Sequence, residues 1–190
     1  MRPVIAILGW GSLIWDKHPD FSRHHRVWQF DGPLLPIEFS RISKTRAGAL
    51  TLVVDSSFGS HCKTAFAISK RADPEDAICD LRTREGTTKK NIGFLFVDGS
   101  AHQTRDAAIG TTIETWAKQR SIDVVVWTDL QSNFEKTAGQ PFSVPAAISY
   151  LASLPESGKF YAAEYIGKAP DFVVTPLRSE LLTHSWFKTT

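Results

Sequence analysis

Residues 4–13, VIAILGWGSL, pass from a continuous apolar stretch into a turn that contains two glycines. Val4–Leu8 is short, rich in β-branched and aliphatic residues and free of polar ones, which is typical of a β-strand buried on both faces. The stretch stops at Gly9, and the chain then turns sharply through residues 10–12. We therefore expect the fold to begin with a buried strand followed directly by a tight turn.

Five further apolar runs lie downstream of this turn, separated by segments that contain proline, glycine or serine. Their length and their content of β-branched and aromatic residues are typical of strands. Several follow one another without an intervening helix, so part of the sheet is expected to be antiparallel. The predicted strands are Ile37–Ile42, Ala49–Asp55, Lys63–Ser69, Ile92–Val97 and Ile122–Trp127.

Helix signals begin at Asp73, a good N-cap, with Pro74 at the first helical position and acidic residues after it. This helix should run to about Arg84. Apolar residues at helical spacing predict a second helix over Ala107–Arg120. Two more should open at Ser143 with Pro145 and at Thr175 with Pro176. Strands and helices do not alternate strictly, which favours an α+β fold or a mixed β-barrel over a doubly wound sheet.

Composition sets the broad class of protein. The 190 residues, 42% of them hydrophobic, are enough for one domain over residues 1–190 with a full core. A formal net charge of +2 is too small to predict a nucleic-acid or membrane partner. Cys62 and Cys79 lack the spacing of a disulfide framework or a zinc site, which fits a reducing cytoplasm. The apolar N-terminal stretch is shorter than the ~18 residues of a membrane span and lacks a signal-peptide cleavage site.

The turn after the first strand is the first candidate site. Its glycines permit positive φ, and successive backbone N–H groups in such a turn can converge on an anionic oxygen. Ser12 adds a hydroxyl at the same place. The turn lacks the third glycine of a dinucleotide-binding fingerprint and the Gly-Lys-Ser/Thr of a phosphate loop. The alternative is a tight turn that simply needs glycine.

Glu85 is the second candidate, because it stands at the predicted C-terminal end of the helix that begins at Pro74. The helix dipole disfavours a negative charge there by about 0.3–1 kcal/mol on an exposed surface. Arg82, Arg84 and Gly86 obey the rules for a helix end, and Glu85 breaks them. Such local conflicts are expected at functional sites, and the alternative is a surface glutamate paired with its neighbouring arginines.

Together the two segments resemble a known superfamily. Residues 7–15, ILGWGSLIW, closely resemble the Gly-Tyr-Gly-Ser-Leu-Ile-Trp signature that opens γ-glutamylcyclotransferases of the ChaC-like type. Residues 84–86, Arg-Glu-Gly, resemble the later acidic motif of that superfamily, and residues 39–43 and 46–52 look like a degraded form of its intervening strand pair. The resemblance covers about the first half of the chain. Trp10 and Phe94 stand where the superfamily usually has tyrosine.

The resemblance implies a mixed β-barrel flanked by helices and a cytoplasmic enzyme that needs neither metal nor organic cofactor. Its small-molecule γ-glutamyl substrate would release 5-oxoproline when its own α-amine attacks its γ-carbonyl. This chemistry needs a base rather than a protein nucleophile. Glu85 is then the catalytic residue, and the residues expected to bind substrate are Gly9, Trp10, Gly11, Ser12 and Leu13.

The sequence is also compatible with other functions. The pocket could belong to a non-catalytic module that binds a γ-glutamyl or other amino-acid-like ligand. Ser12 could belong to a hydrolase triad, although the Gly-x-Ser-x-Gly elbow is absent. Residues 127–134 form a polar segment after the last strand, where substrate groups often bind, or a simple packed connection. Two clusters are expected to be solvated rather than functional: the histidines His18, His24, His25 and His61, and the cations Arg82, Arg84, Lys89 and Lys90.

Overall fold

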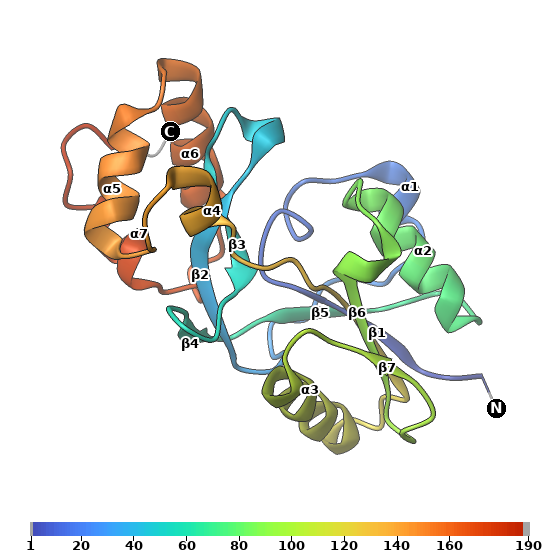
Figure 1. Ribbon diagram of the computed structural model, residues 1–190. Helices are drawn as coiled ribbons and strands as arrows, with labels where there is room; N and C mark the ends of the chain where they lie inside the picture. Colours follow the sequence, from blue (N-terminus) through green and yellow to red (C-terminus); the bar gives the residue numbers. More distant parts are fainter. Residues whose placement is uncertain (1, 188–190) are drawn as a thin grey trace. The chain divides into compact units, whose positions relative to one another are not determined.

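The computed structural model describes residues 2–187 and has an α+β fold with a mixed sheet (Figure 1). Contacts between residues divide the chain into two compact units. Unit 1 consists of Met1–Leu34 and Lys63–Leu130, and unit 2 of Leu35–Cys62 and Gln131–Thr190. Each unit is therefore assembled from two separate stretches of sequence. The expectation of one domain over residues 1–190 stays a prediction.

Unit 1 is built around a five-stranded sheet in the order β5-β1-β8-β6-β7. β1 and β8 are parallel, and the other neighbouring pairs are antiparallel, so the sheet is mixed. The strands are β1 (Ile5–Gly9), β5 (Ala65–Ile68), β6 (Ile92–Phe96), β7 (His102–Gln103) and β8 (Val124–Thr128). The helices are α1 (Pro19–Ser22), α2 (Pro74–Arg84) and α3 (Ala107–Gln119), and a 3₁₀ turn, η2, spans Lys89–Asn91.

Helix α2 covers one face of this sheet. It begins as predicted, because the Asp73 carboxylate accepts a hydrogen bond from the Glu75 N–H and Pro74 occupies the first turn. Its apolar residues join alternate residues of β1, β6 and β8 in one buried cluster. That cluster consists of Ile5, Ile7, Phe21, Ala77, Ile78, Leu81, Ile92, Val124 and Val126.

Helix α3 covers the opposite face. Leu8 and Phe66 are directly paired across β1 and β5, so their side chains share a face, and the ring of Phe66 lies 5.0 Å from that of Trp116 in α3. Trp127 points to this face too. A Cβ added to Gly93, its partner on β6, would overlap the indole ring, which explains the glycine at that position.

Unit 2 contains a three-stranded antiparallel sheet in the order β3-β2-β4, with a register shift between Glu38 and Arg41. The strands are β2 (Leu35–Ile42), β3 (Leu50–Val54) and β4 (Ser60–Cys62). Four helices come from the C-terminal part of the chain: α4 (Phe134–Ala138), α5 (Val144–Ser153), α6 (Glu156–Lys168) and α7 (Pro176–Leu181). A 3₁₀ turn, η1, spans Lys44–Arg46.

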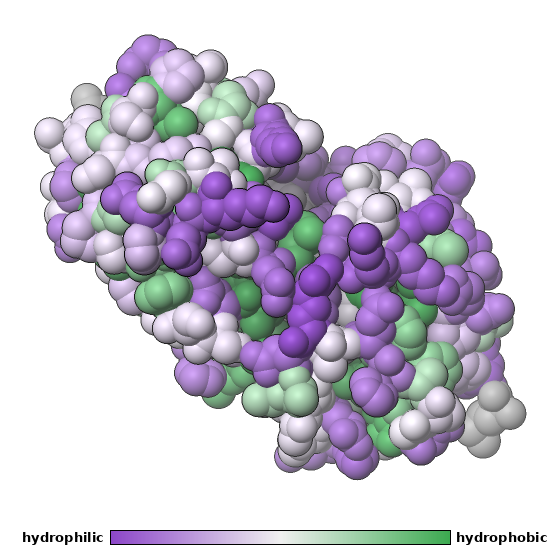
Figure 2. Space-filling model, viewed as in Figure 1, coloured by the Kyte–Doolittle hydropathy of each residue, from purple (hydrophilic) through white to green (hydrophobic). Residues whose placement is uncertain are grey.

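The six predicted strands and four predicted helices are all confirmed, with bounds that shift by a few residues. The helices α1, α4 and α6 and the two short strands β4 and β7 were not predicted from the sequence. No closed barrel is found among residues 2–187, so the β-barrel stays a prediction. On the face shown in Figure 2, hydrophobic residues appear as separate groups among hydrophilic ones. Within the described part of the chain, no helix has the length and apolar character needed to span a membrane.

Candidate functional site

The candidate site lies in unit 1, at the edge of the sheet where β1 and β8 end. The two strands are parallel, with Ile5 opposite Val124 and Ile7 opposite Val126, so their carboxyl ends meet at the same edge. The antiparallel strand β6 begins at this edge, where Ile92 pairs with Thr128. In sheets with parallel strands, ligands commonly bind just outside the carboxyl ends. Both motifs singled out in the sequence lie at this edge.

The turn after β1 presents unused backbone donors. The Gly11 carbonyl accepts from the Ile14 N–H at 3.0 Å, and the Ser12 carbonyl accepts from the Asp16 N–H at 2.8 Å. Among residues 2–187, no acceptor pairs with the N–H groups of Gly11, Ser12 and Leu13. Three successive free N–H groups in a turn can hold an anionic oxygen.

The physical reason expected for the glycines of this turn is wrong. Neither Gly9 nor Gly11 is among the described residues with positive φ. Gly9 is favoured instead by a close approach, because an added Cβ would lie 3.0 Å from two ring carbons of Trp28. Trp10 is buried, with 5% of its surface exposed, and Leu13 packs against the cluster under α2. The turn is therefore fixed by packing on both sides.

Arg84 connects the turn after β1 to the end of α2 through hydrogen bonds. Its Nη2 atom donates to the Asp16 carbonyl at 3.1 Å and lies 3.5 Å from the Ser12 carbonyl. The same nitrogen is 3.5 Å from a carboxylate oxygen of Asp16. Only 10% of the Arg84 side chain is exposed. The expectation that Arg84 belongs to a solvated basic face is therefore wrong, because its guanidinium is used to hold the turn.

Glu85 is the C-cap residue of α2, and Gly86, with φ of 57°, ends the helix after it. The Oε1 atom of Glu85 lies 3.7 Å from Nη1 of Arg84, and 19% of the side chain is exposed. One guanidinium thus contacts both the Ser12 carbonyl and the Glu85 carboxylate. The structure brings together the two sequence motifs, which are separated along the chain by α1, β2, η1, β3, β4 and β5.

Thr128, in the polar segment of residues 127–134 that the sequence predicted as a possible place for substrate groups, adds a hydroxyl at this edge. Strand alternation places its side chain on the face of Val124 and Val126, which α2 covers. Its hydroxyl oxygen is buried and has no hydrogen-bond partner, and the same is true of Nε of Arg84. Buried polar groups in proteins are nearly always paired, so unpaired ones call for an explanation such as a bound ligand or water. Here two of them lie at the same edge of the sheet.

A hydrogen-bonded network shapes the neighbouring part of this edge. Arg105 donates from its backbone N–H to the Asp129 carboxylate at 2.8 Å and from Nη2 to Asn91 at 2.6 Å. Burial raises the pKa of Asp129, and the hydrogen bond from the Arg105 N–H opposes this effect. Thr128 ends β8 and Asp129 follows it, and both belong to the predicted polar segment of residues 127–134.

The remaining sequence candidates add nothing to the site. Lys89 is paired with Glu75 at 2.6 Å. Phe94 lies in β6 and packs against the cluster under α2. Within the described residues no group of three or more His, Cys, Asp or Glu side chains is arranged to hold a metal ion. The expectation that His25 is solvated is wrong, because it is buried, with its ring centroid 4.9 Å from that of Phe21 at a tilt of 52°, and this burial lowers its pKa.

Comparison of the chain with models of protein families, with curated proteins and with solved structures gives no match. A function therefore has to be argued from the motifs and from the chemistry of this edge. The groups available there are three backbone N–H donors, a guanidinium, a hydroxyl and a carboxylate. This set can bind an anionic or strongly polar small molecule and can accept one proton.

Proposed function

We propose that the chain is a γ-glutamylcyclotransferase-like enzyme that releases 5-oxoproline from a γ-glutamyl amide or peptide. The observation that carries the proposal is the double contact of Arg84, which reaches both the turn at Ser12 and the carboxylate of Glu85. The two motifs of the resemblance thereby share one small region, as a common site requires. The substrate class comes from the resemblance, and the geometry supplies groups that suit it.

The reaction needs no nucleophile from the protein. The α-amine of the substrate attacks the γ-carbonyl carbon, a new C–N bond closes the five-membered ring, and the original γ-amide C–N bond breaks. The α-ammonium must first lose a proton, and the departing amine must gain one. A single carboxylate within reach of both nitrogens can carry that proton, and general acid–base catalysis of this kind contributes typically 10²–10⁴-fold. We assign this role to Glu85.

The free N–H groups of the turn suit the negative charge of the reaction. When the amine attacks, the γ-carbonyl oxygen becomes an oxyanion, and donors held in place beforehand stabilise it. Loss of one such donor costs about 2.7–4 kcal/mol in other enzymes. The N–H groups of Gly11, Ser12 and Leu13 take this role or hold the α-carboxylate, and the unpaired Nε of Arg84 and hydroxyl of Thr128 are further partners for polar atoms of the substrate.

The second candidate is a module that binds such a ligand without converting it. The specific observation in its favour is the contact between Glu85 and Arg84, because a carboxylate next to a guanidinium can hold an ammonium group without taking its proton. The two functions would use the same residues at this edge of the sheet and differ in one step. Only the fate of the ligand separates them.

The test is incubation of the pure protein with glutathione, a γ-glutamyl amino acid and a γ-glutamylamine, followed by mass spectrometry for 5-oxoproline. We expect product from at least one compound. Glu85→Gln keeps the size of the side chain but removes the proton acceptor, so turnover should fall at least ~100-fold while ligand binding survives. Glu114→Gln, at an exposed pair with Lys118 on α3, is the matched control and should keep full activity.

A ligand recovered unchanged after long incubation would assign the chain to the binding module. Near-normal turnover by Glu85→Gln would remove Glu85 from the role of base. Failure of every compound both to bind and to react would overturn both functions.

A further inference from the structure

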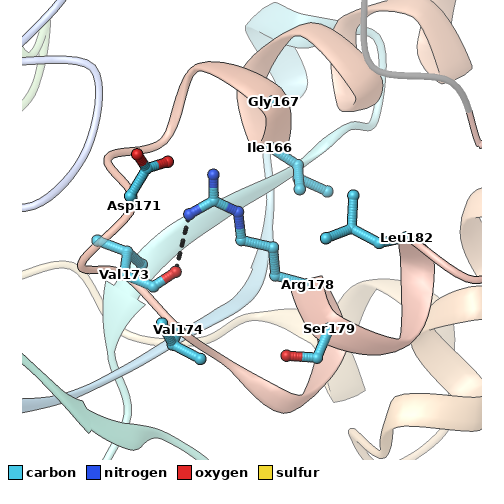
Figure 3. A pocket seen from close by; sticks show the side chains of 8 residues that line it. All are labelled: Ile166, Gly167, Asp171, Val173, Val174, Arg178, Ser179 and Leu182. Carbon is cyan, nitrogen blue, oxygen red and sulfur yellow. Dashed lines mark hydrogen bonds between the residues drawn. The ribbon is translucent and has the colours of Figure 1, made fainter.

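Unit 2 contains a cavity of about 290 Å³ that the proposed reaction does not use (Figure 3). It is lined by the last turn of α6, by residues 171–174 and by α7. Ile166 and Val173 on its wall are fully buried, whereas Val174 and Leu182 are 63% and 62% exposed. Its volume is at the lower end of the range for small-molecule sites. The cavity therefore offers a small apolar space that opens to solvent.

Arg178 places a cation in this cavity. Its Nη1 atom donates to the carbonyls of Pro170 and Val173 at 2.7 and 2.9 Å, and Nη2 donates to the carbonyl of Ala169 at 2.7 Å. Figure 3 shows the bond to Val173. Carbonyl oxygens orient the guanidinium but do not cancel its charge. Burial lowers the pKa of Arg178, yet an arginine side chain stays protonated in proteins.

Two N–H groups of the Arg178 guanidinium donate no hydrogen bond within the described residues. Arginine has five side-chain N–H donors, and those of Arg178 that remain without an acceptor among the described residues are Nε–H and one Nη2–H. This edge matches a carboxylate in a bidentate arrangement. Unit 1 contains an example, because Arg71 binds Asp80 through Nε at 2.7 Å and Nη2 at 2.8 Å.

Asp171 places an anion in the same cavity. Its carboxylate has neither a hydrogen bond nor an ion pair with any of residues 2–187, and in Figure 3 it lies beside the guanidinium of Arg178. Its negative charge reaches Arg178, since it raises the pKa of that residue against the larger effect of burial. Two opposite charges thus line one cavity without pairing directly.

We propose that this cavity binds an α-amino acid with an aliphatic side chain. The carboxylate of the ligand pairs with the free edge of Arg178, and its ammonium group pairs with Asp171. The side chain lies against Ile166, Val174 and Leu182. A simple carboxylic acid would leave Asp171 facing a like charge, and a simple amine would leave Arg178 without an anion. The zwitterion satisfies both charges and covers the exposed apolar groups.

The proposed amino-acid site lies wholly within unit 2, whereas the candidate catalytic site lies in unit 1. A result that contradicts one proposal therefore leaves the other untouched. The test uses the full chain labelled with ¹⁵N and titrated with L-leucine up to about 10 mM, a range that detects millimolar dissociation constants. Amide signals of Ile166, Val173, Val174 and Leu182 should shift. Signals of the turn at residues 11–13 should not.

Changes to the ligand test its carboxylate and its ammonium group separately and leave the protein unaltered. N-acetyl-L-leucine keeps the carboxylate and lacks the ammonium group, and L-leucinamide keeps the ammonium group and lacks the carboxylate. Each should bind at least ~10-fold more weakly than L-leucine, because each loses one charge-assisted pair. Equal binding of either compound would overturn the assignment. So would shifts that appear at residues 11–13 instead, or no shift at the highest concentration.

A variant of the protein tests the charge of Asp171. Asp171→Asn should weaken the binding of L-leucine at least ~10-fold, because the ammonium group of the ligand loses its charged partner. The fold should persist, since this carboxylate makes no hydrogen bond or ion pair with residues 2–187. Glu180→Gln is the matched control, because Glu180 is on the same helix as Arg178 but does not line the cavity. The Glu180→Gln variant should bind L-leucine with the affinity of the natural chain. Wild-type affinity in Asp171→Asn would contradict the proposal.

Discussion

Nη1 of Arg84 lies 3.7 Å from Oε1 of Glu85, so two consecutive residues at the end of α2 direct opposite charges toward one another. Glu85 is the C-cap residue of α2 and keeps right-handed helical backbone angles, with φ of −84° and ψ of −4°. The other terminal nitrogen of Arg84 reaches the Asp16 carbonyl at 3.1 Å. The guanidinium therefore positions the acidic motif and the turn as one unit.

Arg84→Lys should separate these two contacts, because an ammonium group on a flexible stem cannot reproduce a planar fork. We expect kcat/KM on the active γ-glutamyl substrate to fall at least ~10-fold, or about 1.4 kcal/mol. The free energy of unfolding should drop by about 1.5–3 kcal/mol, since hydrogen bonds from a charged donor to the carbonyls of residues 12 and 16 are lost. Arg82→Lys, an exposed position on the same helix, is the control and should change neither quantity. Unchanged turnover in Arg84→Lys would show that the double contact does not organise the site.

Thr128→Val removes a buried hydroxyl that has no partner, at almost constant volume. Without substrate, the variant should be as stable as the natural chain or up to about 1–3 kcal/mol more stable, because no hydrogen bond is lost and a desolvated polar group disappears. Its kcat/KM should still fall at least ~10-fold if the hydroxyl binds substrate. Thermal unfolding and steady-state kinetics measure the two effects.

Thr64→Val is the contrasting control for Thr128→Val. Thr64 is fully buried, and its hydroxyl donates to the Pro33 carbonyl at 2.8 Å. This variant should lose about 1–3 kcal/mol of stability and keep its turnover. If both variants are destabilised alike, the hydroxyl of Thr128 has a structural partner and not a ligand.

Glu38 offers a prediction that does not depend on the function. It is fully buried in unit 2, and burial raises the pKa of its carboxyl, although its Oε1 accepts a hydrogen bond from the Phe39 N–H at 2.7 Å. A pKa above the unfolded value means that the folded chain binds the proton more tightly. The stability from this group is therefore full below the unfolded pKa and is lost as pH rises through the folded pKa.

Glu38→Gln removes this titration. The free energy of unfolding of the natural chain should decline relative to that of the variant as pH rises from acid toward neutral, as measured by urea unfolding at several pH values. The negative charge of Asp55 also raises the pKa of Glu38, so it adds to the effect of burial. Glu135→Gln, at an exposed carboxyl on α4, should follow the natural chain across the range. A constant difference between Glu38→Gln and the natural chain would contradict the assignment.

Local signals in the sequence were enough for most elements. The limits of α2 were predicted as Pro74 to about Arg84 because the cap and the first turn carry their own chemistry, and Asp73 makes the expected bond. Helix α6 was missed because its N-cap, Pro155, makes no side-chain bond and Gly158 interrupts the pattern. That glycine has a tertiary cause, since an added Cβ would lie 2.7 Å from the Ala47 carbonyl.

The site was predictable in part. The turn and Glu85 stood out as motifs, and the structure brings both to one edge of the sheet. The role of Arg84 could not be read locally, because a basic residue suits the end of any helix whether it faces solvent or another segment. Only the contact with residues 12 and 16, which are distant in sequence, separates the two cases.

Trp10 stands where the γ-glutamylcyclotransferases that this turn resembles usually have tyrosine, and it is 5% exposed. An indole donates one hydrogen bond and accepts none, so no step can use an acceptor oxygen at this position. Because the ring is buried, we expect it to act as packing for the turn. Trp10→Tyr should then lower the free energy of unfolding by about 1–3 kcal/mol, since a smaller ring leaves space and its hydroxyl needs a partner.

The effect of Trp10→Tyr on catalysis should be smaller than its effect on stability. We expect kcat/KM to change by less than about 10-fold, or ~1.4 kcal/mol, because the N–H donors of residues 11–13 belong to the backbone and persist in the variant. Trp186→Tyr, at a ring that is 37% exposed in unit 2, is the control and should alter neither quantity. The measurement compares both variants with the natural chain on glutathione and on a γ-glutamyl amino acid. Activity on glutathione that the natural chain lacks would mean that the indole selects the substrate, and loss of activity on every compound in a folded variant would mean that it takes part in the reaction.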